Sequence, residues 1–316
     1  MKHSVTTLLF LAAVGTAHSQ FIYDDWIFSV AYIANQSTGG GGTGFFVSRE
    51  IQTNQSLIFL VSNGHVLAPK GLAQGETNRL ARAQVFITRE ENGQLSTGTL
   101  DVTLREPDGA SRVVTNPNTN VDVAVVDVTS LVVENRGIRK GYKVGLVPEN
   151  RFASLATITN THVTIGQQIV FLGYPLNLIE GKTAIAVARG GVIATPPDRD
   201  FRSRPVFLVD SATIRGSSGS PVFLPLRNYK IEKQPNGSTR VNPLGGYTPC
   251  LLGIVAETIK DWELTVKRTD TFGQEPTAVS VVATANFGIV FRADAISETL
   301  DATGVPRVQT KGQTEY

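Results

Sequence analysis

Cysteine and histidine are scarce in this sequence. Cys250 is the only cysteine, so no disulfide can form within the chain. Of the four histidines, His3 and His18 lie near the N-terminus, which leaves His65 and His162 for the rest of the chain. These are too few ligands for a zinc site built from three histidines or from clustered cysteine and histidine. We therefore expect no metal site and no cofactor, and any histidine-dependent chemistry must use His65 or His162.

Excess charge and long hydrophobic runs are also missing. The 29 basic and 27 acidic residues give a formal net charge of +2, which provides no electrostatic basis for binding nucleic acid or an anionic membrane surface. No stretch reaches the roughly 20 apolar residues that a membrane-spanning helix needs. The sequence is nevertheless 41% hydrophobic, so it can bury a substantial core. We expect a soluble protein without a membrane anchor, and the composition leaves its oligomeric state open.

The first residues have the order of a secretory signal peptide. Lys2 and His3 give a short basic start, Leu8–Val14 is an unbroken apolar run, and residues 17–19 place small side chains at alternate positions. The apolar run is far shorter than a bilayer-spanning helix. We therefore predict a cleaved signal over residues 1–19, with cleavage near Ser19, and a mature chain that is secreted or periplasmic.

Short β-rich segments, separated by glycine, proline, asparagine and aspartate, fill most of the mature chain. Many short strands with frequent turn signals favour antiparallel barrels or sandwiches. The strands form two groups, so we predict two similar halves at about 25–135 and about 160–300. One helix is expected at Ala293–Ala302, where Ile296 and Leu300 lie one turn apart. The expected strands are Trp26–Ile33, Gly44–Ser48, Leu57–Ser62, Ala83–Arg89, Thr99–Arg105, Ser111–Thr115, Asp122–Val128, Gln168–Tyr174, Thr183–Thr195, Pro205–Asp210, Pro221–Leu224, Leu251–Thr258 and Phe287–Phe291.

Two polar insertions interrupt the second group of strands. They span Arg227–Pro249 and Ile259–Ala285. Loops of this length are commonly functional or disordered. The sequence gives neither of them a role.

The strongest chemical signal is the segment 216–222, which reads Gly-Ser-Ser-Gly-Ser-Pro-Val. A serine that attacks a carbonyl group must lie on a tight turn with unhindered backbone, and the flanking glycines allow such a turn. The backbone N–H groups of Gly216 and Ser218 would then converge on one point and stabilise the oxyanion of a tetrahedral intermediate. A flexible glycine–serine hairpin without chemistry is the alternative for this segment taken alone.

A serine nucleophile needs a base and a group that orients the base. The segment Leu60–Leu67 places His65 at the end of an apolar strand, and Asn120–Val125 places Asp122 at the start of another. His65 would accept the proton of Ser218 through one ring nitrogen. Asp122 would hold the N–H of the other nitrogen and stabilise the imidazolium. These three residues are the predicted catalytic triad.

Each member of the triad has a rival nearby. His162 is the other histidine, but no strand like that of Asp122 lies between it and the serine segment. Asp127 ends an apolar strand instead of opening one, and Asp122 itself has the alternative of a turn residue that caps a strand. Ser217 is adjacent to Ser218, but the Gly-x-Ser-Gly frame selects Ser218.

Four motifs together resemble those of trypsin-like serine peptidases, chiefly the bacterial branch. The resemblance runs from about residue 26 to residue 300 and implies a pair of six-stranded antiparallel β-barrels with the active site in the cleft between them. It also implies that residues 20–316 form an all-β serine endopeptidase domain that acts on protein or peptide substrates. The motifs, in the family's order of His, Asp and Ser, are Gly42-Thr43-Gly44-Phe45, Ser62-Asn63-Gly64-His65-Val66, Asp122-Val123-Ala124 and Gly216-Ser217-Ser218-Gly219-Ser220-Pro221.

The resemblance also assigns a substrate pocket. In the family its floor lies six residues before the nucleophile, which is Ala212 here, with Thr213 beside it and a wall from Ala256 and Thr258. An unpaired buried cation is costly, and Ala212 offers no carboxylate to balance one. We therefore expect no demand for lysine or arginine. Thr258 replaces the glycine of wide pockets and should narrow this one, so small or medium uncharged residues are expected before the scissile bond and large aromatic residues are disfavoured.

Several positions depart from the family pattern. Ser220 replaces the glycine of many relatives and makes the segment similar to that of glutamyl endopeptidases, but Val255 stands where those enzymes are expected to have a histidine. Ala256 stands where many relatives have a serine that supports the catalytic aspartate. In digestive relatives an aspartate directly before the nucleophile pairs with a freshly cut N-terminal amine. Ser217 offers no charge there, so we expect no zymogen switch of this kind.

Two other function classes compete with the endopeptidase. A non-catalytic binding protein with the same barrels usually shows a lost triad residue, and none is lost here. A carbohydrate-binding β-sandwich would explain the strands and the export signal, but it leaves the ordered motifs as coincidence. The 2 tryptophans and 7 tyrosines also give such a module little material for stacking on sugars.

Overall fold

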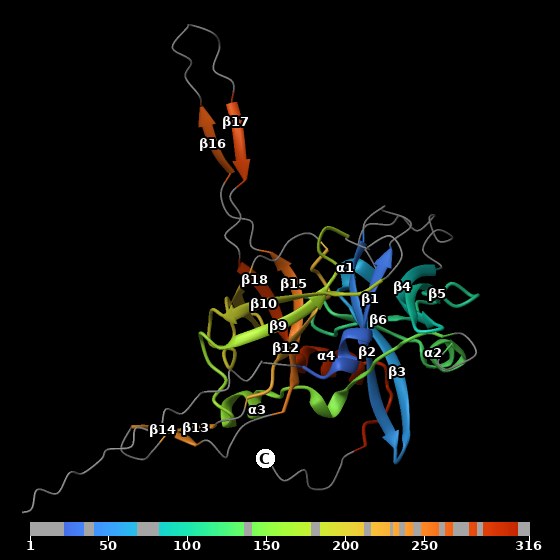
Figure 1. Ribbon diagram of the computed structural model, residues 1–316, viewed down its shortest axis with the longest axis horizontal. Helices are drawn as coiled ribbons and strands as arrows, with labels where there is room; N and C mark the ends of the chain where they lie inside the picture. Colours follow the sequence, from blue (N-terminus) through green and yellow to red (C-terminus); the bar gives the residue numbers. More distant parts are fainter. Residues whose placement is uncertain are drawn as a thin grey trace, which may run out of the picture.

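The computed structural model describes residues 22–34, 41–67, 82–135, 141–177, 184–211, 216–227, 230–233, 238–242, 248–258, 263–267, 278–282 and 287–308. Within these ranges the strands gather into two groups that lie side by side, with the C-terminal helix close to both (Figure 1). The predicted signal peptide, residues 1–19, lies outside the described residues.

The N-terminal strands form one eight-stranded sheet, in which β8 pairs with β2 beside the path β5-β4-β1-β2-β3-β7-β6. Asn92 and Gly93, both with positive φ, connect β4 to β5, as expected for a two-residue hairpin turn of this composition. A bridge between Arg105 and Ser111 joins the two ends of the path, so the sheet curls into barrel one. The bounds are β1 (Val30–Ala34), β2 (Gly41–Gln52), β3 (Gln55–Ser62), β4 (Arg82–Glu91), β5 (Gln94–Thr103), β6 (Val113–Thr115), β7 (Ala124–Asp127) and β8 (Val147–Pro148).

The seven strands around the path of barrel one match the seven expected in this half of the sequence, one more than the family resemblance implies. β6 and β7 form a hairpin of their own, because Val114 pairs with Val125 across the loop between them. That loop carries Asp122. Barrel one therefore has seven strands around its path, and β8 pairs in parallel with the middle of β2.

The C-terminal strands form barrel two, a closed six-stranded barrel with the order β10-β11-β18-β15-β12-β9. Every neighbouring pair is antiparallel, and buried side chains such as Phe171, Phe207 and Val290 fill its interior. The all-β class and the closed six-stranded barrel predicted for this half are confirmed. The bounds are β9 (Gln168–Gly173), β10 (Val187–Ile193), β11 (Val206–Asp210), β12 (Pro221–Leu224), β15 (Cys250–Thr258) and β18 (Phe287–Arg292).

Apolar side chains from both barrels meet in a third buried cluster. Trp26, which precedes β1, stacks on Phe223 of β12 with the ring centroids 4.8 Å apart. Helix α4 (Ala293–Asp301) adds Ile296 and Leu300, both fully buried, and confirms the predicted C-terminal helix to within one residue. Because these contacts are buried, they hold the two barrels in a fixed relation.

Several short elements differ from expectation. Residues 26–29, predicted as the start of a strand, belong to the 3-10 helix η1 (Asp24–Ser29), because the N–H of Trp26 bonds to the carbonyl of Tyr23. Each polar insertion contains a hairpin, β13–β14 and β16–β17, that stands away from the barrels in Figure 1. The remaining bounds are α1 (Gly64–Leu67), α2 (Thr129–Asn135), η2 (Glu149–Arg151), α3 (Leu155–Asn160), η3 (Pro175–Asn177), β13 (Lys230–Lys233), β14 (Thr239–Asn242), β16 (Glu263–Lys267) and β17 (Ala278–Val282).

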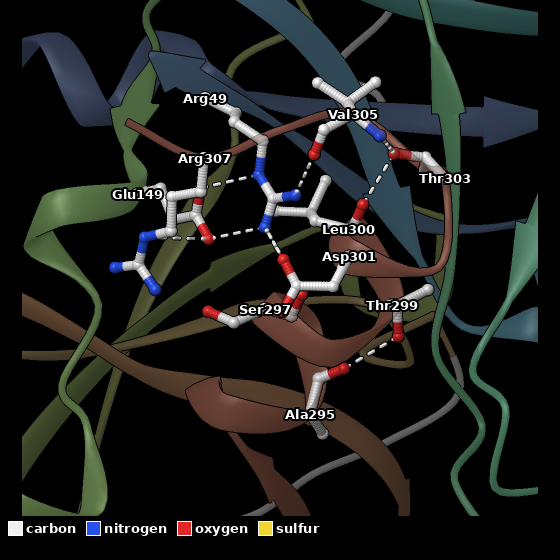
Figure 2. A network of polar contacts seen from close by, with 10 residues as sticks. All are labelled: Arg49, Glu149, Ala295, Ser297, Thr299, Leu300, Asp301, Thr303, Val305 and Arg307. Carbon is white, nitrogen blue, oxygen red and sulfur yellow. Dashed lines mark hydrogen bonds and ion pairs between the residues drawn. The ribbon is translucent and has the colours of Figure 1, made fainter. Parts of the chain in front are cut away.

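Arg49, on β2, is a fully buried cation at the centre of an ionic network (Figure 2). Its guanidinium donates to both carboxylate oxygens of Glu149, at 2.8 and 2.9 Å, and to Asp301 at 2.6 Å. It also donates to the carbonyl of Val305 at 3.1 Å. Burial by itself lowers the pKa of Arg49, but the two carboxylates outweigh burial and raise it. The network ties barrel one to η2 and to helix α4.

Removing the buried carboxylate of this network is expected to destabilise the fold. Glu149→Gln removes the carboxylate that is 4% exposed and leaves a buried cation underpaired, so the free energy of unfolding should fall by about 3 kcal/mol or more. Asp301→Asn is the matched control, since that carboxylate is 60% exposed and should contribute about 1 kcal/mol or less. Urea unfolding of the two variants measures the difference, and equal losses would contradict it.

Candidate active site

His65 lies on α1, a single helical turn that follows β3. The N–H groups of Val66 and Leu67 both bond to the carbonyl of Asn63 at 3.1 Å, and the side chains of Val66 and Leu67 are buried in barrel one. Because these two apolar side chains face inward, the imidazole of His65 faces outward, with 51% of its side chain exposed.

Asp122 lies in the loop that precedes β7 and faces His65. Its Oδ2 lies 2.5 Å from Nδ1 of His65, and its Oδ1 accepts the backbone N–H of the same residue at 3.1 Å. Asn63 holds the loop from the other side, because its Nδ2 donates to the backbone carbonyl of Asp122 at 2.7 Å. The carboxylate of Asp122 therefore contacts both the imidazole ring and the backbone N–H of His65.

The environment of Asp122 favours its charged form. Burial acts to raise the pKa of this carboxyl group, but the hydrogen bond and the charge of His65 lower it, and the backbone N–H groups of His65 and Gly64 add to that effect. The net result is a pKa below the ordinary value of aspartate. The pair therefore stabilises the fold at neutral pH, and this contribution is lost as the pH falls through the lowered pKa.

Ser218 lies on a tight turn between β11 and β12. Gly216 and Gly219 both have positive φ, 91° and 87°, conformations that glycine adopts without steric cost. The N–H of Ser220 bonds to the carbonyl of Ser217 at 3.0 Å, and the N–H of Gly219 bonds to the carbonyl of Val255 on β15 at 2.8 Å. A side chain at Gly219 would meet the backbone oxygen of residue 43 at 1.8 Å, so only glycine fits there.

Gly42, on β2, brings the serine turn and the histidine helix together. A Cβ at this position would lie 2.7 Å from the side chain of Val66 and 3.4 Å from the carbonyl oxygen of Ser218. The neighbouring residue, Thr43, donates its N–H to that same carbonyl at 2.9 Å. The turn of Ser218 and the helix of His65 are therefore packed against the same point of the strand.

The rival residues lie in other surroundings. Asp127 accepts the backbone N–H and the hydroxyl of Thr129, at 2.8 and 2.6 Å, and so caps the start of α2. His162 has a positive φ in the loop after α3, where its N–H bonds to the carbonyl of Thr159. Neither contact brings the rival to Asp122 or to the serine turn.

The residues of the predicted substrate pocket are only partly described. Ala212 and Thr213 lie outside the described residues, and of Thr258 the structure gives the backbone, which pairs with Gly288. Ala256 is the extra residue of a β-bulge in β15 and is 3% exposed. Its side chain belongs to the buried cluster between the barrels, so it offers little surface to a substrate.

Sequence patterns gave no role to two residues that the site uses. Asn63 bonds to Asp122, and Thr43 contacts the serine turn through both its backbone and its side chain. Both stand inside motifs quoted for the family resemblance. Thr43 lies between two glycines, and Asn63 lies two residues before His65. That placement was the available signal, but the contacts themselves join segments that are distant in sequence.

The part of the chain that the structure describes contains neither a membrane-spanning helix nor a cluster of metal ligands. None of its helices there is long and apolar enough to cross a membrane. No group of three or more histidine, cysteine, aspartate and glutamate side chains gathers there as metal ligands would.

A family model described as a trypsin-like peptidase domain matches residues 42–227, more than half of the chain. The matched span includes His65, Asp122 and Ser218. No curated protein matches the chain.

Proposed function

Because the chain belongs to the trypsin-like peptidase family, and hence to the hydrolases that act on proteins or peptides, we propose that it is a secreted serine endopeptidase. Its catalytic triad consists of His65, Asp122 and Ser218. The observation that carries this proposal is that Asp122 contacts both the ring nitrogen and the backbone N–H of His65, beside a serine turn flanked by glycines.

In the proposed mechanism, Nε2 of His65 takes the proton of Ser218 as the hydroxyl attacks the carbonyl carbon of the scissile bond. The same nitrogen then gives the proton to the departing amine, which leaves an acyl group on the serine. A water molecule, activated by His65 in the same way, releases the acyl group as a free acid. Asp122 holds the Nδ1–H side of the ring throughout, and so fixes the tautomer in which Nε2 is free to accept a proton.

Stabilisation of the oxyanion is assigned to the backbone N–H groups of Gly216 and Ser218. A preorganised donor contributes most where it points at developing charge and cannot relax away. The turn supports this role, since hydrogen bonds to Val255 and within residues 217–220 hold its backbone. The two positive-φ glycines allow the close bend that brings the donors together.

The proposal is tested first by the chemical class of the activity. The purified protein should hydrolyse casein and quenched fluorescent peptides. A sulfonyl fluoride, which modifies activated serines, should abolish this activity, and a metal chelator should leave it unchanged. Tight peptide binding without hydrolysis would instead support a non-catalytic binding protein with the same fold.

The side-chain preference is expected to be for small or medium uncharged residues before the scissile bond. The proposed pocket has Ala212 on its floor with Thr213 beside it, and the backbone of the strand that carries Ala256 and Thr258 forms its wall. None of these four residues can balance a full charge. The preference should be graded, because one methylene in such a pocket changes binding by about 1–3 kcal/mol. Profiling on a peptide library measures it. Cleavage after lysine or arginine would contradict the assignment, and cleavage after glutamate would support the glutamyl endopeptidase alternative.

A further inference from the structure

Thr43 contacts three separate segments at the centre of the candidate site, and its side chain is fully buried. Its N–H donates to the carbonyl of Ser218 at 2.9 Å, and its hydroxyl donates to the carbonyl of Gly216 at 2.9 Å. The hydroxyl also accepts the N–H of Tyr174 at 3.1 Å, while the Thr43 carbonyl accepts the hydroxyl of Ser62 at 2.6 Å. Every polar group of the residue is therefore in use.

The hydroxyl of Thr43 has a defined direction. A hydroxyl has one hydrogen to donate, and its oxygen already accepts from Tyr174, at the end of β9. The single hydrogen is thus left for the carbonyl of Gly216. The β-branched side chain also has few allowed rotamers on a strand. Thr43 consequently acts as a fixed donor.

The backbone of Gly216 needs such a donor. Glycine has little conformational preference of its own, and Gly216 has a φ of 91°. The direction of the following peptide group must therefore be set by a hydrogen-bond partner. Within the described residues, the bond recorded for the Gly216 carbonyl comes from Thr43.

Three successive carbonyl groups of the serine turn are held in this way. Those of Gly216 and Ser218 accept from Thr43, and that of Ser217 accepts the N–H of Ser220. In a trans peptide group the N–H points opposite to the C=O. Because the carbonyl of Ser217 points toward Ser220, the N–H of Ser218 in the same peptide group points in the opposite direction, away from the bond between Ser217 and Ser220.

We infer that the Thr43 hydroxyl positions the oxyanion-binding turn, an inference that rests on the function proposed above. The peptide group after Gly216 carries the N–H of Ser217 and links the two donor residues. Without the Thr43 hydroxyl this link is free to rotate, and the N–H groups of Gly216 and Ser218 on either side of it are no longer held toward one point. The loss falls on the transition state, where the charge develops, and leaves the binding of uncleaved substrate unchanged. Thr43 is thus a positioning residue for catalysis from barrel one, acting on a turn that belongs to barrel two.

Matched variants test this inference by steady-state kinetics. Thr43→Val keeps the shape of the side chain and removes the hydroxyl, so kcat should fall by about ten- to a hundredfold with little change in KM. Thr43→Ser keeps the hydroxyl and should retain most of the wild-type kcat. Thr299→Val is the structural control, since the hydroxyl of Thr299 is also fully buried and bonded, to Ala295 and Asn116.

A second readout separates positioning from a general loss of stability. A peptide boronic acid forms a tetrahedral adduct on the serine, and its affinity for Thr43→Val should fall by the same factor as kcat/KM. The affinity of a product peptide should not change. A wild-type kcat in Thr43→Val, an equal loss in Thr299→Val, or no recovery in Thr43→Ser would overturn the inference.

The inference and the proposed function fail in different ways. If the wild-type protein neither hydrolyses peptides nor binds the boronic acid, the proposed function is wrong. Crystal structures of the two Thr43 variants then decide the positioning role by themselves. The carbonyl of Gly216 should change direction in Thr43→Val and keep it in Thr43→Ser. An unchanged carbonyl in both variants would overturn the inference.

Discussion

Replacing Ser218 with alanine is expected to lower kcat by about 10⁵- to 10⁶-fold, because the nucleophile of the acyl transfer is lost. The fold should be unaffected. The hydrogen bond described for Ser218 runs through its backbone carbonyl to Thr43, and alanine keeps that group. Kinetics with a fluorogenic peptide and a thermal unfolding curve of the same preparation measure both effects.

His65→Ala should cost nearly as much, and the double variant should be little worse than either single one, because triad members act as a unit. Ser217→Ala is the control for the assignment of the nucleophile. Its hydroxyl is adjacent to Ser218, but it lies outside the Gly-x-Ser-Gly frame, so this variant should keep most of its activity. Losses of kcat that multiply in the double variant, or full activity in Ser218→Ala, would contradict the assignment of the triad.

Asp122→Asn is expected to lower kcat by about 10⁴-fold. The amide can donate a hydrogen bond to Nδ1 of His65, which favours the tautomer that carries its proton on Nε2 and cannot accept one from the serine. Because Oδ2 of Asp122 lies 2.5 Å from Nδ1 of His65, the amide nitrogen that replaces this oxygen would contact the ring nitrogen directly. The acid limb of a stability profile should change as well, because the lowered pKa of Asp122 contributes stability only above that pKa.

Asp127→Asn is the matched control for that experiment. Asp127 has the same side chain, lies five positions later, at the end of β7, and accepts hydrogen bonds from Thr129 at the start of α2. Because asparagine can still accept the N–H of Thr129, this variant should change stability by less than about 1 kcal/mol and leave kcat unchanged. A fall in kcat equal to that of Asp122→Asn would identify Asp127 as the orienting carboxylate instead.

Local sequence was sufficient to predict most of the fold. The strands follow alternating apolar patterns, and Asn92 with Gly93 encodes the hairpin between β4 and β5. The helix α4 was visible from two apolar residues one turn apart. Single-turn elements were not predictable in this way, since α1 and η1 are too short to show a helical period. Their form depends on the backbone carbonyls of Asn63 and Tyr23, which accept hydrogen bonds from N–H groups three or four residues later.

The residues of the candidate site also differ in whether local sequence could predict them. Residue type and order led to Asp122, His65 and Ser218, because each stands in a short motif whose chemistry has few alternatives. Thr43, and also Arg49 outside the site, could not be found in this way, because their hydrogen-bond partners are distant along the chain. Thr43 meets a residue 173 positions away, and Arg49 meets one 100 positions away. Such contacts exist only once both barrels are folded.

Labelling of the mature protein with a fluorophosphonate probe tests the central claim most directly. The protein should begin at Gln20, with no further proteolysis, since Ser217 offers no carboxylate for a new N-terminal amine. Tryptic digestion gives the peptide Gly216–Arg227, and fragmentation in the mass spectrometer locates the probe within it. The account predicts modification of Ser218 in the folded protein and none after denaturation. Modification of another serine, or of Ser218 only after additional cleavage, would contradict it.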